Sequence, residues 1–143
     1  MENQTTMNPA LVRSGTWGEL WIDGEKVAEC YGFTLKAKKE KEKVPLCRVM
    51  VTGHKVTSVS VTGGVKIYNA TSRLIELEAE ILSGKDHRHT IISNLADPDN
   101  PRNQRIVAKG VSFDDVTLAD WEAAKLGTID APFTADSVEI LDT

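Results

Sequence analysis

Two closely spaced histidines are the first residues in this sequence whose types and spacing could do chemistry. His87 and His89 flank Arg88, and a strand would place both imidazoles on one face, a spacing that can bind a metal ion. A metal site needs a third and a fourth ligand, and Asp86 is the one neighbour that could help. We therefore interpret both histidines as exposed residues at a strand edge, with a metal site as the alternative, and predict no cofactor.

Other polar groups match known catalytic or binding motifs only in part. The stretch 52–55 (TGHK) has neither the spacing of a phosphate-binding loop nor a following helix. Asp97, Asp99 and Asn100 offer oxygen ligands for calcium, but prolines interrupt them and no downstream glutamate completes an EF-hand loop. We interpret 97–103 as a turn-rich loop. No G-x-S-x-G motif occurs, and the chain is predicted not to be an enzyme.

Composition narrows the remaining classes of function. The 143 residues suffice for one domain, and 41% hydrophobic with 27% charged residues is typical of a globular protein. A formal net charge of −4 argues against a protein built to grip nucleic acid. No apolar run approaches the roughly 20 residues of a membrane helix, and residues 1–9 lack the apolar core of a signal peptide. We expect no membrane anchor and synthesis in a cytoplasm.

Most of the chain is predicted to form β-strands. Residues 1–14 are polar without periodicity and are interpreted as a flexible N-terminal arm, followed by a β domain over 15–143. Asp23-Gly24 between two strand-like segments predicts a hairpin. Short turns separate the segments, so the sheets should be mostly antiparallel. The expected strands cover 16–22, 26–37, 46–52, 56–68, 87–96, 104–113, 116–121 and 131–141.

One helix is expected, over residues 71–83. Thr71 or Ser72 can cap its start, Gly84 can cap its end, and the leucines and isoleucine of the segment fall on one helical face. Glu76, Glu78 and Glu80 are interpreted as its solvated face. The fold class that follows is mainly β with one α-helix, an antiparallel sandwich or a partly open barrel.

The segment 56–68 alternates most clearly between an apolar and a polar face. Val59, Val61, Val65 and Ile67 share one side, and Gly63-Gly64 suggests a bulge or a bend. The opposite side is polar and is either the outer face of an ordinary sandwich or the lining of a water-filled channel. The candidates for a lining are Ser58, Ser60, Thr62 and Lys66, with Thr34 and Lys36 from the preceding strand.

A charged run and two cysteines complete the features of interest. Residues 38–43 (KKEKEK) form an exposed loop or a strand extension. Pro45 restricts any strand at that point to a sheet edge or to its first residue. Such a loop could contact an acidic neighbour through Lys38, Lys39, Lys41 and Lys43. Cys30 and Cys47 are interpreted as small buried apolar residues, with a disulfide as the alternative.

The sequence resembles the tail tube proteins of contractile phages and phage-tail-like bacteriocins of Gram-positive bacteria. The matching stretches are 18–25 (GELWIDGE), 50–55 (MVTGHK), the polar strand to Tyr68 with Thr71-Ser72, and 111–114 (VSFD). The resemblance spans about residues 15–140, and the Gly-His-Lys stretch with its spacing to the helix is its most specific part.

The resemblance implies a tail tube β fold and a purely mechanical role. Six copies would form a ring, and stacked rings would form a tube with a polar lumen. Contacts between rings could then involve Lys38, Lys39, Lys41 and Lys43 of the charged run. The tube would lie inside a sheath, around a tape-measure protein, between a baseplate or tube initiator and a tail terminator. Genomic DNA would be transiting cargo if the particle is a phage. The chain would reside in the virion or tailocin particle, assembled in the bacterial cytoplasm.

A monomeric β-sandwich or OB-like module that binds nucleic acid or carbohydrate is the alternative function. It predicts a sharp monomer in solution and a measurable affinity for such a ligand. The tube hypothesis rests instead on open strand edges, which are an aggregation hazard in a monomer and a means of assembly in an oligomer.

Overall fold

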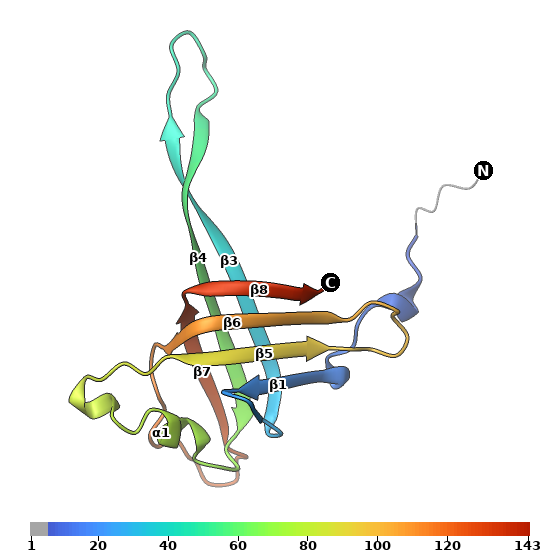
Figure 1. Cartoon of the computed structure of the whole chain (residues 1–143), viewed down its shortest axis with the longest axis vertical. Coiled ribbons are helices and arrows are strands. Elements are labelled where there is room, and N and C mark those ends of the chain that lie inside the picture. The colour runs from blue at the N-terminus through green and yellow to red at the C-terminus, as the bar shows by residue number, and fades with distance from the viewer. Residues whose placement is uncertain (1–5) are drawn as a thin grey trace.

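The chain folds into two β layers whose strands cross each other (Figure 1). The computed structural model describes residues 6–143. β1, β5, β6 and β8 form one layer, and β3, β4 and β7 run across them in the other. The strands are β1 (Gly18–Ile22), β2 (Glu25–Lys26), β3 (Cys30–Val44), β4 (Gly53–Tyr68), β5 (His89–Leu95), β6 (Gln104–Phe113), β7 (Thr128–Ala135) and β8 (Ser137–Asp142); α1 is Arg73–Leu77, and 3-10 turns cover Pro9–Leu11, Gly15–Trp17 and Ile81–Ser83.

All strand pairs are antiparallel, in the order β2-β1-β5-β6-β7-β4-β3, with β8 paired to β6. β6 joins the layers: its earlier part pairs with β5 and β8, whereas Ser112 and Phe113 pair with β7. Gly110 lies at this transition with φ +65°, and a Cβ there would lie 2.9 Å from Cβ of Asp136. Glycine alone fits both demands, so it permits the change of partner.

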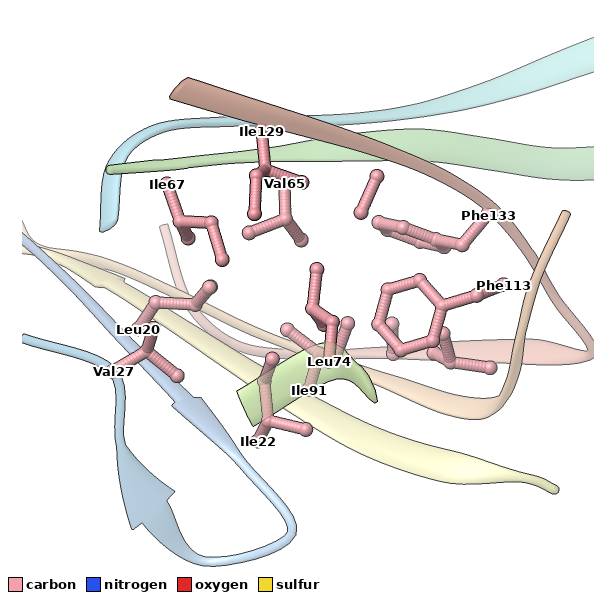
Figure 2. Packing of buried hydrophobic residues seen from close by; sticks show 13 residues of the cluster. Leu20, Ile22, Val27, Val65, Ile67, Leu74, Ile91, Phe113, Ile129 and Phe133 are labelled. Carbon is pink, nitrogen blue, oxygen red and sulfur yellow. The ribbon is translucent and has the colours of Figure 1, made fainter. Parts of the chain in front are cut away.

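The core lies between the two layers (Figure 2). The β3–β4–β7 layer contributes Val65, Ile67 and Phe133 to this core. They pack against residues of the other layer, such as Leu20 on β1 and Ile91 on β5. The ring of Phe133 stacks on Phe33 at 6.0 Å and receives the edge of Phe113 at 6.1 Å. The predicted fold class is therefore confirmed: the protein is mainly β and antiparallel, and its sheet is not closed.

The predicted hairpin turn at Asp23-Gly24 is confirmed, but the strand after it is not the one expected. Both turn residues have positive φ, and Ile22 pairs with Glu25 across them. β2 ends after two residues, and the chain then crosses to the other layer, where β3 pairs with β4 along its whole length. The expected strand 26–37 was thus wrong at its start, because Val27 is buried in the core between the two strands.

Three further strand predictions need correction. Residues 46–52 form the connection between β3 and β4, although their valines favour strands, because a hairpin must reverse direction there. Residues 116–121 belong to the long loop between β6 and β7. The single expected strand 131–141 is two strands, β7 and β8, which turn at Asp136 and pair with different neighbours.

The expected helix 71–83 is much shorter than its periodicity suggested. α1 spans five residues and a 3-10 turn follows at Ile81–Ser83, so the segment is helical only in pieces. Leu74 is buried, whereas Leu82 is 87% exposed, which shows that no continuous apolar face meets the core. Gly84 adopts the left-handed conformation expected of a terminal cap, with φ 79°.

Gly63 and Gly64 do not form the expected bulge. They pair regularly with Leu35 and Thr34, and the register shifts of the β3–β4 pair lie elsewhere. A Cβ on Gly63 would clash with the carbonyl oxygen of Thr34 and would lie 2.7 Å from Cζ of Phe133. The first glycine is therefore required by close packing inside the sheet.

The cysteines are less buried than expected. Cys30 is half-buried, and Cys47 is exposed in the turn of the β3–β4 hairpin. Both thiols are free, so the disulfide alternative is also wrong. Burial raises the pKa of the Cys30 thiol, and the neighbouring Glu29 carboxylate raises it further. The thiol donates a hydrogen bond to the carbonyl oxygen of Gly32 at 3.3 Å.

Candidate assembly surface

The solvent side of β3, β4 and β7 carries a continuous row of polar side chains. Cross-strand partners share a face, so the register places Lys36 beside Thr62 and Lys38 beside Ser60. Thr134 on β7 extends the row past Thr62. We call this surface the polar face; it consists of Thr34, Lys36, Lys38, Ser58, Ser60, Thr62, Lys66 and Thr134.

The opposite side of the same strands is the core. Phe33, Val65 and Ala131 stand next to one another on that side, and Phe133 lies over Gly63. The alternation therefore predicted correctly which side is polar, and the structure brings all six expected lining residues together on it. Seven members of the polar face are exposed, and Ser60 is half-buried with its Oγ donating to Oε1 of Glu40 at 3.4 Å. That this face lines a lumen remains a prediction.

The outer half of the β3–β4 hairpin projects away from the two layers (Figure 1). β7 ends at Ala135 opposite Val61, so beyond that point β3 and β4 pair only with each other. Val59 is 59% exposed there, although it continues the apolar alternation, because no second layer covers this part. The expected dry face thus extends only as far as the body of the protein.

The four lysines proposed for contacts between rings all lie on this projection. Lys38, Lys39, Lys41 and Lys43 belong to β3, which confirms the strand-extension interpretation of the charged run, and all are exposed. Lys38 is on the polar face and Lys39 points to the opposite side. A register shift after Glu40 reorients the remaining residues. No contact assigns these lysines a partner ring, and that role remains a prediction.

Two long strand edges are open within residues 6–143. β3 pairs with β4 on one side only, along 15 residues, and β8 pairs with β6 on one side only. Such edges present unpaired N–H and C=O groups that can accept another strand. The β3 edge borders the polar face directly, so a strand added there would extend that face.

The interpretation of His89 as an exposed edge residue is wrong. Its ring is buried, with Nδ1 2.7 Å from Asp23 Oδ2 and Nε2 2.9 Å from Glu78 Oε1. Both ring nitrogens are therefore within hydrogen-bond distance of a carboxyl group. His87 is half-buried, and its Nε2 lies 3.9 Å from Oε1 of Glu80. Within the described chain no group of three such side chains is placed to hold a metal ion.

Glu78 also corrects the prediction of a solvated acidic face. Glu76 and Glu80 are exposed as expected, but Glu78 is 4% exposed and holds His89. Because α1 ends before Glu78, the helical periodicity that would have turned this residue outward does not apply. The trio Asp23, His89 and Glu78 is thus a brace between the β1–β2 turn, β5 and the end of α1.

A second brace joins the start of β3 to α1. Arg73 Nε donates to Glu29 Oε1 at 2.8 Å, and the hydroxyl of Thr71 donates to the same oxygen at 3.0 Å. Burial raises the pKa of Glu29, but the hydrogen bonds from Arg73, from its own backbone N–H and from Thr71 outweigh it and hold the pKa below its usual value. The carboxylate therefore stabilises the fold in its ionised form.

The loop 97–103 is structural, as its turn residues predicted. The backbone N–H of Ser14 donates to Asp97 Oδ2 at 2.8 Å, and that of Asp99 donates to Oδ1 at 2.9 Å. These bonds lower the pKa of the Asp97 carboxyl. Asn100 donates to the carbonyl of Leu11 at 2.9 Å, so the loop also contacts residues of the predicted arm. Residues 1–5 lie outside the described part, and the arm's flexibility remains a prediction.

Sequence reasoning missed an exposed apolar segment at the end of the hairpin. Leu46, Val49, Met50 and Val51 are all more than half exposed, and Met50 is 99% exposed. The signal was present, because Pro45 and the charged run before it indicate an exposed stretch, but strand propensity concealed it.

Solved structures with the same fold come from contractile injection systems. One is a chain of the sheath–tube complex of the extracellular contractile injection system PVC in its extended state, with a TM-score of 0.70, 9% identity and 88% of each chain covered. Another belongs to the PVC sheath/tube terminator, with a TM-score of 0.71, 10% identity and coverage of 96% of this chain and 99% of that one. At these identities the likeness establishes the fold alone, which this chain shares with chains of contractile injection systems.

The family follows from the sequence match. The family model for phage tail tube protein matches residues 5–142, so the chain belongs to the phage tail tube protein family and is a tail tube subunit. Among its relatives is the phage-like element PBSX protein XkdM of Bacillus subtilis (strain 168), 28% identical over 130 residues that cover 89% of this chain and 88% of the relative. In the described residues, no helix is both long and apolar enough to span a membrane.

Proposed function

We propose that six copies of this chain form a ring, and that stacked rings form a tube whose lumen is lined by the polar face. One observation carries the proposal: the six expected lining residues share one solvent-facing side of the β3–β4 sheet, whose other side is core within the body of the protein and whose β3 edge is open. Extending this sheet from copy to copy generates a continuous wall that is polar on one side.

The copies join through different edges of the same sheet. The open edge of β3 in one copy pairs with β4 of the next copy. On β4 the contact uses the edge that β7 leaves free before Val61. Such a contact uses two different surfaces, so it closes into a ring when its rotation divides a full turn. The backbone groups of β3 then gain partners that the single chain does not supply.

The side chains of the polar face suit passage rather than binding. Most are small hydroxyl residues, and they offer neither an apolar pocket nor a chelating group. Lys66 stands opposite Asp130 on β7, so part of its charge is balanced locally. Lys36 and Lys38 add positive charge further along the wall, and Glu40, the cross-strand partner of Ser58, offsets part of it, so the attraction for a polyanion in transit would be weak.

The tube is proposed to function inside a contractile particle, a virion or a tailocin assembled in the host cytoplasm. The shared fold with chains of a sheath–tube complex and of a sheath/tube terminator supports a sheath around the tube and a terminator at its end. A tape-measure protein in the lumen, a baseplate or tube initiator, and DNA as cargo in a phage complete the proposal. The role is mechanical, without catalysis. The monomeric binding module is not favoured, because the family match covers nearly the whole chain.

Cysteine accessibility tests the position of the polar face. A Cys47→Ser background removes the exposed thiol, and Ser60→Cys or Thr62→Cys then places one on the polar face. Labelling with a small maleimide and with a large polyethylene-glycol maleimide is compared before and after assembly, which negative-stain microscopy monitors. We expect both reagents to react with free subunits and only the small one to reach assembled tubes. Equal reaction of the large reagent with intact tubes would place this face outside.

A further inference from the structure

A pair of tyrosines interrupts the run of small side chains at one end of the polar face. Tyr68 is the last residue of β4 and lies two positions after Lys66, so it shares the polar side of the sheet. The ring of Tyr31, at the start of β3, packs on it with the ring centroids 4.5 Å apart and the planes tilted by 31°. We call these two residues the tyrosine pair. It lies at the end of β4 away from the projecting hairpin (Figure 1).

A β-bulge brings Tyr31 to this side of the sheet. Cys30 and Gly32 pair with consecutive residues of β4, so Tyr31 is an extra residue in β3. In a regular strand Tyr31 would lie on the same side as Phe33, which packs against the core. Bulges that re-aim a side chain are frequent next to functional sites. The bulge thus presents an aromatic ring on a face that is otherwise built mainly from small polar residues.

The tyrosine pair does not serve the core. Tyr31 and Tyr68 are 46% and 49% exposed, and neither belongs to the buried cluster between the two layers. Tyrosine combines a large apolar ring with a polar hydroxyl, and it is enriched at protein interfaces for this reason. A substantial part of each side chain is thus available to a partner that reaches the polar face.

The charges next to the pair favour a polypeptide as that partner. Lys66 stands opposite Asp130 on β7, and Tyr68 stands opposite Thr128, so these cross-strand partners carry no net charge. A nucleic acid duplex keeps the faces of its bases stacked inside, whereas stacking on tyrosine needs unpaired bases. Apolar side chains of a polypeptide, by contrast, gain from contact with the exposed ring surface.

We propose that the tyrosine pair is the contact of the tube wall with a polypeptide in the lumen that presents apolar side chains. The inference rests on the proposed function, because the pair faces the lumen only if the polar face lines it. One pair in each copy forms a collar around the lumen, and stacked rings repeat the collar along the tube. Many weak and identical contacts then hold the polypeptide, whereas the hydroxyl-lined wall between the collars leaves it free to slide.

Tyrosine chemistry tests the contact directly, because these two residues are the only tyrosines in the sequence. Tetranitromethane nitrates accessible tyrosines, and mass spectrometry locates the products. A Cys47→Ser background removes the exposed thiol, which the reagent would oxidise. We expect Tyr31 and Tyr68 to react in empty tubes. They should react several times more slowly in tubes assembled with a helical peptide that carries a leucine stripe, and a peptide with serine in place of leucine should give no protection.

Variants separate a specific contact from simple trapping of the peptide. Co-sedimentation of the fluorescein-labelled leucine peptide with assembled tubes measures how much is retained. Tyr31→Ser with Tyr68→Ser should retain roughly tenfold less peptide, because aromatic anchors carry much of the binding energy of an interface. Tyr31→Phe with Tyr68→Phe keeps the rings and should retain about as much as the unaltered chain. Trp121→Ser, which removes an exposed aromatic residue of the loop between β6 and β7, should do the same.

Three results would overturn the inference and leave the tube itself standing. They are tyrosines that do not react in empty tubes, a leucine peptide that protects them no better than its serine counterpart, and full retention of the peptide by the double serine variant. Retention of a labelled DNA duplex that requires the tyrosines would also overturn it and assign the pair to nucleic acid. If the double serine variant does not assemble, nitration of tubes with both tyrosines intact decides alone. A chain that forms no tubes, or a polar face that the large maleimide reaches in intact tubes, would overturn the proposed function itself.

Discussion

Nε2 of His89 lies 2.9 Å from Oε1 of Glu78, and both side chains are buried where the end of α1 meets β5. On the other side of the ring, Asp23 reaches Nδ1 from the β1–β2 turn at 2.7 Å. Three segments distant in sequence are thus held by one imidazole. The ring also packs on Phe113 at 5.6 Å, which keeps water away from the inner bond.

Breaking this buried pair should destabilise the fold strongly. Glu78→Ala removes one partner and leaves a buried nitrogen of the imidazole without a hydrogen-bond partner, so we expect a loss of about 3 kcal/mol in the free energy of unfolding. Urea denaturation measures it, and Glu76→Ala, at an exposed site, should change stability by less than about 0.5 kcal/mol. The combined Glu78→Ala and His89→Ala variant should lose less than the sum of the single losses. Strict additivity would show that the pair does not act as a unit.

The Glu29–Arg73 brace should make stability depend on pH. The folded-state pKa of Glu29 is held below 4.5, its ordinary value, so the stabilisation is complete above the unfolded-state pKa and is lost as pH falls through the folded-state pKa. Glu29→Gln should therefore cost about 2 kcal/mol near pH 7 and almost nothing once the pH is below both values. Urea denaturation at a series of pH values between 7 and about 2 follows the difference.

Glu25→Gln is the matched control for that series. Glu25 also contacts Arg73, at 3.2 Å, but its side chain is 80% exposed, so we expect a change of less than about 0.5 kcal/mol at any pH. If the two variants gave the same pH profile, the hydrogen bonds to Glu29 could not be the source of its ionised-state stabilisation.

Adjacent glycines in β4 should respond very differently to the same substitution. Gly63→Ala forces a methyl group against the carbonyl of Thr34 and the ring of Phe133, and we expect it to cost about 2 kcal/mol or more. Gly64→Ala adds the same methyl on the polar face, where the nearest atom, the carbonyl oxygen of Ala131, is 3.9 Å away. It should be neutral or slightly stabilising. Thermal melts of the two variants side by side decide the matter, and equal melting temperatures would refute the packing argument.

The sequence predicted the features of this fold that depend on local pattern. Alternation identified which side of β3 and β4 is polar, and Asp23-Gly24 identified a turn, because both signals are contained in a few consecutive residues. Burial of His89 depends on Glu78 and Asp23, 11 and 66 residues away, and no local rule connects them. The helix was overestimated for the same reason: its leucines fit a helical face, but whether that face meets a core is a tertiary property.

The residues of β3 and β4 that form the polar face were predicted from the sequence, but the extension of that face onto β7 was not. All six lining candidates fall on one face, yet the contribution of Thr134 required knowing that β7 pairs with β4. Residues 46–52, at the end of the β3–β4 hairpin, were mistaken for a strand, because their valines favour strands. The sequence alone does not show that no neighbouring strand pairs with this segment.

The contact of Asp97 with Ser14 should tie the position of residues 11–14 to pH. Hydrogen bonds from the backbone N–H groups of Ser14 and Asp99 hold the pKa of this carboxyl below 3.8, its ordinary value. The contact is therefore complete above the unfolded-state pKa and weakens as pH falls through the folded-state pKa.

Asp97→Asn should release the segment at neutral pH, because the amide offers one acceptor oxygen where the carboxylate offers two. The amide chemical shift of Ser14 reports the change, and it should move in Asp97→Asn at pH 7 as it moves in the unaltered chain in acid. Asp99→Asn, exposed in the same loop, should leave it in place. A Ser14 amide that kept its shift in Asp97→Asn would mean that neighbouring contacts, such as that of Asn100 with Leu11, hold the segment by themselves.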